Sequence, residues 1–165
     1  MGEIIQAPAA TLSFCSFRIG DRLCGIDVLH VREISTQVQS TPVPQAPPMI
    51  RGLVNLRSRI HLVADLRPIF DLPSIECTPN SRLIIFKDRL AEGLGVLVDR
   101  VGDIVRASAE QIENTPAEAD EPSPVADVVS NVCKLENELM LIIDPVKLIA
   151  FIEAAIRPST LRTND

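Results

Sequence analysis

The chain has 165 residues, 46% of them hydrophobic, which is enough to bury a core without disulfides or metal ions. A formal net charge of −6, no Trp or Tyr and only five Phe argue against nucleic-acid binding, which uses basic and aromatic side chains. No apolar run approaches the roughly 20 residues of a membrane span, and Glu3 stands where a secretory signal would be basic, so we expect a cytoplasmic protein.

The N-terminal half of the chain is patterned for strands. The segments 12–19 and 23–28 flank Gly20-Asp21, a pair typical of a hairpin turn. Residues 41–48, TPVPQAPP, hold four prolines that lack the amide hydrogen needed in a strand ladder, so we expect a rigid connection there. Polar and apolar residues alternate from 59 to 66, which predicts a strand with one face toward solvent. We assign three residues to that solvent-facing side: Arg59, His61 and Asp65.

The second half adds short apolar segments and a helix. Residues 114–124 combine prolines with acids and indicate an exposed loop. A short helix is expected after Asp65, and Asp144-Pro145 is typical of a helix start because Asp caps the first turn and Pro needs no amide hydrogen there. Three segments rich in branched residues predict strands buried on both faces: Arg82–Phe86, Leu94–Val98 and Leu139–Ile143.

The four cysteines are scattered along the chain. They form no CxxC pair, and neither histidine stands at ligand spacing from them, so we expect no metal site and no cofactor. Three of them lie among apolar strand residues, which predicts reduced core positions. The cysteines are Cys15, Cys24, Cys77 and Cys133.

An internal repeat is the most informative feature of the sequence. The stretch GIDVLHVREI, residues 25–34, matches GVLVDRVGDI, residues 95–104, with four identities at an offset of 70. Further on, LVADLRPIF and LIIDPVKLI align Asp65 with Asp144 at an offset of 79, so the second copy holds nine extra residues. Such self-similarity predicts one small β unit that occurs twice, and two packed units would leave a groove between them.

The two equivalent aspartates raise an enzyme hypothesis. A two-lobed β-barrel hydrolase could pair Asp65 with Asp144, as aspartic proteases pair two carboxylates that share a proton. In those proteases Thr or Ser and then Gly follow the Asp, whereas Leu66 and Pro145 follow here, which favours helix caps. No serine, histidine or glycine pattern of another enzyme class is present.

Four stretches together resemble CheW, the family of coupling proteins of bacterial chemosensory arrays. In the family's order and spacing they are FRIGDRLCGIDVLHVREI, APPMIRGLVNLRSRIHLVADLRPIF, GLGVLVDRVGDIV and LMLIIDPVKLI. The resemblance implies an all-β fold of two five-stranded, SH3-like barrels related by pseudo-symmetry. We expect these intertwined barrels to form one domain over residues 12–156, with flexible tails at 1–11 and 157–165.

The resemblance also implies a function without catalysis. Members of the family bind the histidine kinase CheA through the kinase's own CheW-like regulatory domain. They also bind the cytoplasmic tip of methyl-accepting chemoreceptors in the groove between the barrels. An adaptor of this kind would act in signal transduction for chemotaxis, at receptor arrays on the inner face of the membrane, and would meet the membrane only through receptors.

Candidate partner-binding residues follow from the matching motifs. Arg57 of the NLR motif corresponds to the family arginine most closely tied to coupling, and Glu33 corresponds to the acid of the VxEI motif. Four apolar residues correspond to positions on or near the receptor groove: Val31, Ile34, Val98 and Val101. The alternative for Val31, Val98 and Val101 is a place in the core.

The other arginines of this region have a simpler interpretation. Exposed charges usually contribute little to stability, so we expect plain solvation for Arg51, Arg59 and Arg67. His61 is interpreted as an ordinary residue of the solvent-facing strand side.

One residue departs from the family pattern. Glycine usually follows the NLR arginine, whereas this chain has Ser58. Serine prefers ordinary turn geometry, so we expect a turn that aims Arg57 differently. This departure raises the alternative of a CheW-like scaffold in a non-flagellar pathway that controls surface motility or a second messenger.

Overall fold

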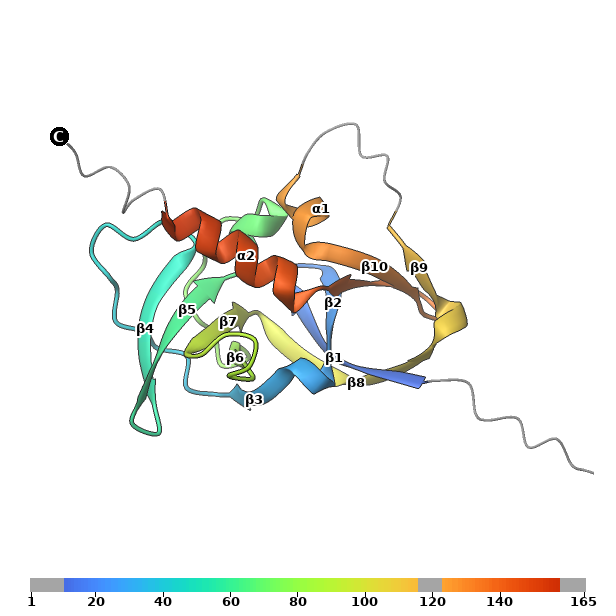
Figure 1. Ribbon diagram of the computed structural model, residues 1–165, viewed down its shortest axis with the longest axis horizontal. Coiled ribbons are helices and arrows are strands. Elements are labelled where there is room, and N and C mark those ends of the chain that lie inside the picture. Colours follow the sequence, from blue (N-terminus) through green and yellow to red (C-terminus); the bar gives the residue numbers. More distant parts are fainter. Residues whose placement is uncertain (1–10, 116–122, 158–165) are drawn as a thin grey trace, which may run out of the picture.

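Two β-sheets dominate the computed structural model, which describes residues 11–115 and 123–157 (Figure 1). One sheet has six strands in the order β8-β1-β2-β11-β10-β9, and the other has five in the order β3-β6-β7-β5-β4. The strands are β1 (Thr11–Ile19), β2 (Arg22–Asp27), β3 (Val31–Ser35), β4 (Ile50–Leu56), β5 (Arg59–Asp65), β6 (Arg82–Phe86), β7 (Leu94–Val98), β8 (Arg100–Ser108), β9 (Ile112–Asn114), β10 (Val129–Lys134) and β11 (Leu139–Ile143). The helices are α1 (Pro124–Val128) and α2 (Pro145–Ile156), with the 3₁₀ turns η1 (Val28–His30), η2 (Arg67–Phe70) and η3 (Ala109–Gln111).

The predicted repeat is a pseudo-twofold relation between the sheets. When each strand of the order β3-β6-β7-β5-β4 is replaced by the strand that matches it in the sequence repeat, the result is β8-β1-β2-β11-β10, which is the order of the other sheet. The strand registers agree: parallel β11 and β2 pair Leu141 with Cys24, and parallel β5 and β7 pair Leu62 with Leu94, which are the same positions at offsets of 79 and 70. The two β units that the resemblance implied are therefore confirmed.

The matching glycines of the repeat each lie against a neighbouring side chain. A Cβ on Gly25 would lie 2.8 Å from Met140 Sδ, and one on Gly95 would lie 2.6 Å from Ile85 Cδ1. Both distances are shorter than a Cβ tolerates, so a larger residue at either position would force the side chain of Met140 or Ile85 to shift.

The two copies exchange strands. The first copy places β1 and β2 in the six-stranded sheet and β3, β4 and β5 in the other, while the second copy does the reverse with β6 and β7. The chain crosses between sheets at η1 and again at Asp99, whose amide donates to the carbonyl of Arg18 at 3.0 Å. Neither sheet is complete without strands from both copies.

Strand β9 is the sixth strand of the six-stranded sheet, and its equivalent in the five-stranded sheet is a single bridging residue, Thr41. Thr41 forms an isolated antiparallel bridge with Leu53, and Glu113 of β9 pairs with Val132 at the equivalent place in β10. Pro42 follows Thr41 at once and has no amide hydrogen, so the ladder stops there. The rigid proline connection was predicted, whereas the Thr41 bridge was not.

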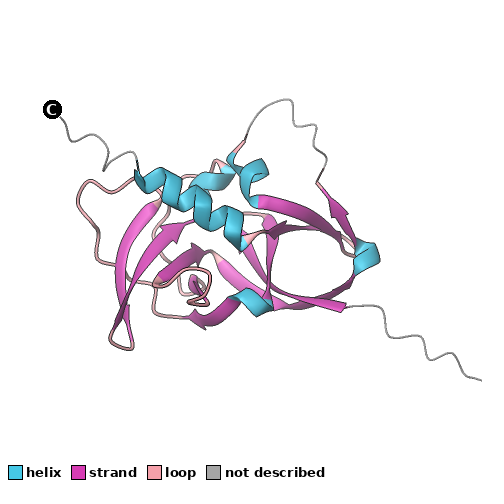
Figure 2. Ribbon diagram, in the orientation of Figure 1, coloured by secondary structure: helices cyan, strands magenta, loops and turns pink. Residues whose placement is uncertain are grey.

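Three clusters of buried side chains form the core. The largest joins residues of both sheets to α2, including Phe17, Phe86 and Ile152. A smaller cluster lies against each sheet. Helix α2 packs with α1 on one side of the molecule (Figure 2). All four cysteines are free; Cys15, Cys24 and Cys133 are buried as predicted, while Cys77 is half-buried.

The predicted faces of β5 were wrong. His61 and Asp65 are 2% and 1% exposed, whereas Ile60, assigned to the dry side, is 59% exposed. Both faces of β5 are covered over most of its length, because Ala64 packs in the largest core cluster and Val63 packs in a second cluster, so alternation does not identify a wet side.

Both predicted helices are confirmed. Asp144 caps α2, with its Oδ1 accepting from the amides of Val146 and Lys147, and a short helix, η2, follows β5. Helix α1, capped by Ser123, was not predicted because five residues carry too little periodicity. The predicted loop at 114–124 lies largely outside the described residues, as do the predicted tails apart from Thr11, which begins β1, and Arg157.

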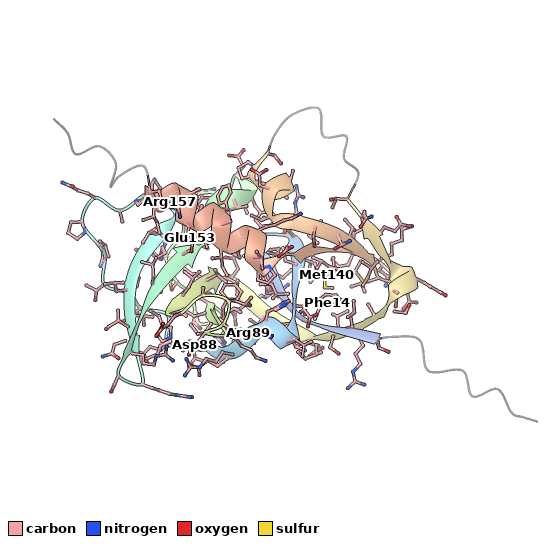
Figure 3. All side chains as sticks on the ribbon, viewed as in Figure 1. Phe14, Asp88, Arg89, Met140, Glu153 and Arg157 are labelled. Atoms are coloured by element: carbon pink, nitrogen blue, oxygen red, sulfur yellow. The ribbon has the colours of Figure 1, made fainter. Side chains whose placement is uncertain are left out.

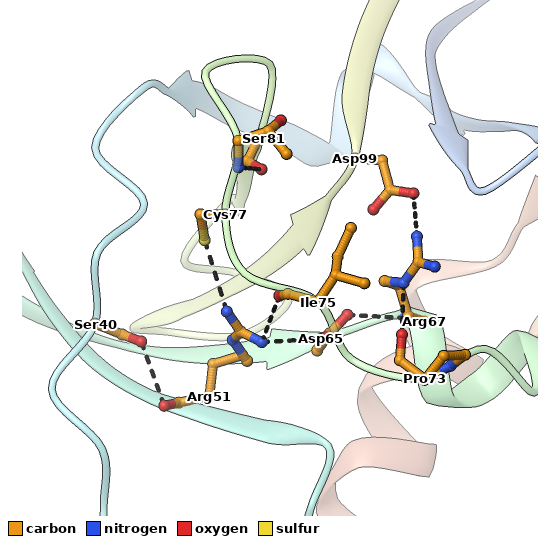
Figure 4. A network of polar contacts seen from close by, with 10 residues as sticks. Ser40, Arg51, Asp65, Arg67, Pro73, Ile75, Cys77, Ser81 and Asp99 are labelled. Carbon is orange, nitrogen blue, oxygen red and sulfur yellow. Dashed lines mark hydrogen bonds and ion pairs between the residues drawn. The ribbon is translucent and has the colours of Figure 1, made fainter.

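A polar network ties the sheets together (Figure 4). Arg67 of η2 donates to Asp99 Oδ2, which also accepts from the amide of Gly20 in the β1–β2 turn at 2.7 Å. Because Asp99 is a crossing point of the chain, this network fixes the junction of the two sheets. Within the described residues, no helix has the length and apolar character to cross a membrane.

Candidate partner-binding surface

The tip of the β4–β5 hairpin is a two-residue turn made by Arg57 and Ser58. The last strand pair is Leu56 with Arg59, and the φ angles of Arg57 and Ser58 are 52° and 67°. Positive φ at both central residues matches the type I′ turn that right-handed strand twist favours. The expectation that Ser58 would take ordinary turn geometry is therefore wrong, because the hairpin holds it in the left-handed region that a glycine would occupy.

Arg57 is the most exposed of the paired arginines. Its side chain is 80% exposed, and its Nη2 lies 3.2 Å from Glu33 Oε2 on β3. β3 and β4 are the two edge strands of the five-stranded sheet, so this ion pair spans from one edge to the other. Gln37 Nε2 makes a second link across the edges, donating to the carbonyl of Asn55 at 3.3 Å.

A shallow hollow of about 280 Å³ lies beside this ion pair. Ile34, which is 40% exposed, contributes an apolar side chain to it. The structure thus brings together a guanidinium, a carboxylate and an exposed branched side chain. The remaining lining residues are Ser35, Thr36, Gln37 and Leu56.

The three valines lie elsewhere. Val98 is 1% exposed and belongs to the core, as its alternative interpretation had it. Val31 is half-buried at the start of β3, where it packs against the largest core cluster. Val101 lies on β8 of the other sheet and lines a separate hollow of about 390 Å³. Sequence correspondence alone did not separate these positions.

The equivalent hairpin of the six-stranded sheet lacks the ion pair. At the repeat offsets, Asp103 takes the place of Glu33 and Glu136 takes the place of Arg57. Asp103 lines the second hollow, yet two acids cannot form the contact that Arg57 and Glu33 make. The cationic hairpin tip is therefore specific to the first copy.

The neighbouring arginines are paired rather than merely solvated, which corrects that expectation. Arg51 Nη1 lies 3.7 Å from Asp65 Oδ2, Arg59 Nη2 lies 3.2 Å from Asp88 Oδ1, and Arg67 pairs with Asp99. Hydrogen bonding from Arg59 holds the pKa of the Asp88 carboxyl below its ordinary value. Arg57 differs from these three because its guanidinium remains largely open to a partner.

The two aspartates of the enzyme hypothesis serve separate local roles. Asp65 Oδ1 accepts from the amide of Arg67 at 2.9 Å, and the buried carboxylate faces Arg51. Asp144, which follows β11 of the other sheet, caps α2. The predicted helix cap is therefore confirmed for Asp144. For η2 the cap residue is Leu66, and Asp65 instead lies one residue before it.

Comparisons with known proteins agree with this architecture. A family model described as a CheW-like domain matches residues 13–153. The chain is 33% identical over 128 residues to the chemotaxis protein CheW of Bacillus subtilis, covering 78% of this chain and 80% of that protein. It is 30% identical over 145 residues to the chemotaxis protein CheW of Klebsiella aerogenes, covering 87% and 84%.

A solved structure shows the same fold. The crystal structure of the scaffolding protein TtCheW from Thermoanaerobacter tengcongensis superposes with a TM-score of 0.72 at 26% sequence identity. The match covers 82% of this chain and 90% of that one.

Proposed function

The chain belongs to the CheW-like family, and from this premise we propose that it is a non-catalytic adaptor that couples chemoreceptors to a CheA-type histidine kinase. Its partners would be the kinase's CheW-like regulatory domain and the cytoplasmic receptor tip. Its place would be at receptor arrays on the inner face of the membrane, with no direct contact to lipid.

The observation that carries this proposal is the exposed Arg57 beside Glu33 and Ile34. Arginine is enriched at interfaces because its planar fork binds carboxylates through two parallel hydrogen bonds. Here one carboxylate, Glu33, already orients the guanidinium, and most of the side chain remains open. The hollow next to it offers Ile34 for apolar contact, so the site combines a charged anchor with a small apolar patch.

We propose that Arg57, Ser58, Glu33 and Ile34 form the kinase-facing surface. Val31 and Val101 would then contribute to a second contact, toward the receptor. The buried Val98 would support them from the core. Ser58 keeps the left-handed turn, so it gives no reason to prefer a non-flagellar pathway over chemotaxis.

The test is a titration of the purified chain with the CheW-like domain of the kinase encoded nearest to it. We expect Arg57→Glu to weaken binding at least about tenfold while the variant stays folded. Arg22→Glu is the matched control, because Arg22 is an exposed arginine next to the turn of the β1–β2 hairpin in the other sheet. Equal binding by wild type and Arg57→Glu would contradict the assignment of Arg57, and no binding by the folded wild type would contradict the partner.

A further inference from the structure

A third concave site lies in the six-stranded sheet, away from the Arg57 hairpin. Its volume is about 240 Å³, and its apolar walls include Leu12, Phe14 and Ile112; Phe14 is labelled in Figure 3. Its polar groups come from five residues: Asp27, His30, Ser130, Asn131 and Asp144. An apolar cavity with a few convergent polar groups is the usual form of a small-ligand site.

Two carboxylates meet at this cavity because of strand register. Parallel β2 and β11 pair Gly25 with Ile142. Asp27 and Asp144 each lie two residues further along, and both line the cavity. Neighbouring strands lie about 4.8 Å apart, so both carboxylates can reach one ligand group.

Each carboxylate accepts a hydrogen bond from a nearby backbone amide with only one of its two oxygens. Asp27 Oδ1 accepts from the amide of Leu29 at 2.9 Å, and Asp144 Oδ1 accepts from the amide of Val146 at 2.9 Å. Among the described residues, no hydrogen bond or ion pair takes either Oδ2. No Lys or Arg of the described part of the chain lines the cavity, and within that part His30 Nδ1 is buried there without a hydrogen-bond partner.

The five-stranded sheet shows which group fills the equivalent place there. Both β4 and β10 carry a register shift at the same place, with Arg51 as the extra residue between Ile50 and Gly52 and Ser130 as the extra residue between Val129 and Asn131. In the five-stranded sheet the guanidinium of Arg51 faces Asp65, the counterpart of Asp144. In the six-stranded sheet the short Ser130 leaves a cavity where that guanidinium would extend.

A second difference between the two sheets adds negative charge to the cavity. Asp65 pairs with Leu97 across β5 and β7, whereas the counterpart of Leu97 is Asp27. The five-stranded sheet therefore has one carboxylate and one internal guanidinium at this place, and the six-stranded sheet has two carboxylates and no Lys or Arg among the described lining residues. A metal ion is not favoured, because the described residues hold no group of three His, Cys, Asp or Glu side chains placed for one.

We propose that the cavity binds an organic cation, a guanidinium or primary ammonium group on a short apolar stem. The cation would sit between Asp27 and Asp144, where charge-assisted hydrogen bonds are strongest, and the stem would pack on Leu12, Phe14 and Ile112. Butylguanidinium, a guanidinium on a four-carbon stem, is a small probe of this class. The proposal is independent of the adaptor function.

The first experiment is calorimetric titration of the full chain with butylguanidinium and with neutral butylurea, which has the same number of heavy atoms. We expect butylguanidinium to bind at least about tenfold more tightly. Ser130→Arg restores the side chain of the first copy and should both raise Tm and remove binding, while Ser130→Ala should retain it. Indistinguishable affinities for the two probes, or unchanged binding by folded Ser130→Arg, would overturn the proposal.

A second variant keeps the test decisive if Ser130→Arg does not fold. Asp27→Leu copies Leu97 of the other sheet and should weaken butylguanidinium binding at least about tenfold. Unchanged binding by this variant would also overturn the proposal. Comparing butylguanidinium with an arginine inside a short blocked peptide identifies the source of the cation: tighter binding of the former indicates a small molecule, and tighter binding of the latter indicates a partner's side chain.

Discussion

Arg57 Nη2 lies 3.2 Å from Glu33 Oε2, and this contact joins the two edge strands of one sheet. An ion pair with so exposed an arginine contributes little to stability, because water screens it and both side chains lose freedom. Its main effect is to hold the guanidinium in one orientation above the hollow that Ile34 lines.

We therefore expect Arg57→Ala and Glu33→Gln each to change the free energy of unfolding by less than about 1 kcal/mol. Urea denaturation measures this directly. Both variants should nevertheless weaken binding of the kinase domain, Arg57→Ala by more than Glu33→Gln, because the first removes the anchor and the second only its orientation. A loss of several kcal/mol in either variant would show that the pair is structural.

Ser58→Gly should stabilise the fold by about 1 kcal/mol. Ser58 has φ of 67°, where a Cβ is strained and glycine is not. The control is Ser74→Gly, at an exposed loop residue without positive φ, which should be neutral or slightly destabilising. Equal effects of the two changes on the urea midpoint would mean that the turn stores no strain at Ser58.

Removing Arg51 should be more damaging than removing any other arginine of the hairpin. Arg51→Met leaves the carboxylate of Asp65 buried without its cation and also removes the hydrogen bond to the carbonyl of Ile75. We expect a loss of about 2–4 kcal/mol, somewhat less than for a fully buried pair because the Arg51 side chain is 24% exposed. In the double variant Arg51→Met with Asp65→Asn, part of this loss should be recovered; purely additive losses would argue against the charge pairing.

The Asp88 carboxyl gives a prediction about pH. Its pKa is lowered in the folded state, chiefly by the hydrogen bond from Arg59, so the stability it contributes is present above the unfolded value and is lost as pH falls through the folded value. Arg59→Gln should thus be less stable than wild type at pH 7, and the difference should shrink on acidification below about pH 4. A constant difference from pH 7 to pH 3 in urea midpoints would contradict this origin.

Thiol reactivity should single out Cys77. Burial raises the pKa of the Cys24 thiol to about 12, and burial also raises the pKa values of Cys15 and Cys133, so little reactive thiolate forms at these sites. In native protein at pH 8, iodoacetamide should modify Cys77 first, with the other three reacting only on unfolding. Mass spectrometry of the alkylated peptides would detect any other order.

The features that depend on patterns readable directly in the sequence were predicted correctly. The Gly25 and Gly95 matches located the repeat, and Asp144-Pro145 located the start of α2. The paired arginines were missed because their partners Asp65, Asp88 and Asp99 are 14 or more residues away along the chain and come near only in the fold.

The assignment of His61 failed for a related reason. Alternation describes one strand, whereas burial depends on what packs against the two faces of its sheet. Core clusters cover both faces of β5, and nothing in the 59–66 segment itself indicates that. Likewise, the burial of Val98 depends on the core shared by both sheets.

The exchange of strands between the two copies has a mechanical consequence. A half-chain cut near residue 76, between η2 and β6, would hold β1 and β2 without the four strands that complete their sheet, and β3, β4 and β5 without β6 and β7. Neither half could bury its apolar faces alone, so we expect both sheets to melt in a single transition and two co-expressed halves to recover the fold only together. Force applied to the hairpin that carries Arg57 would reach the other sheet through the backbone itself, at the two crossings beside η1 and Asp99.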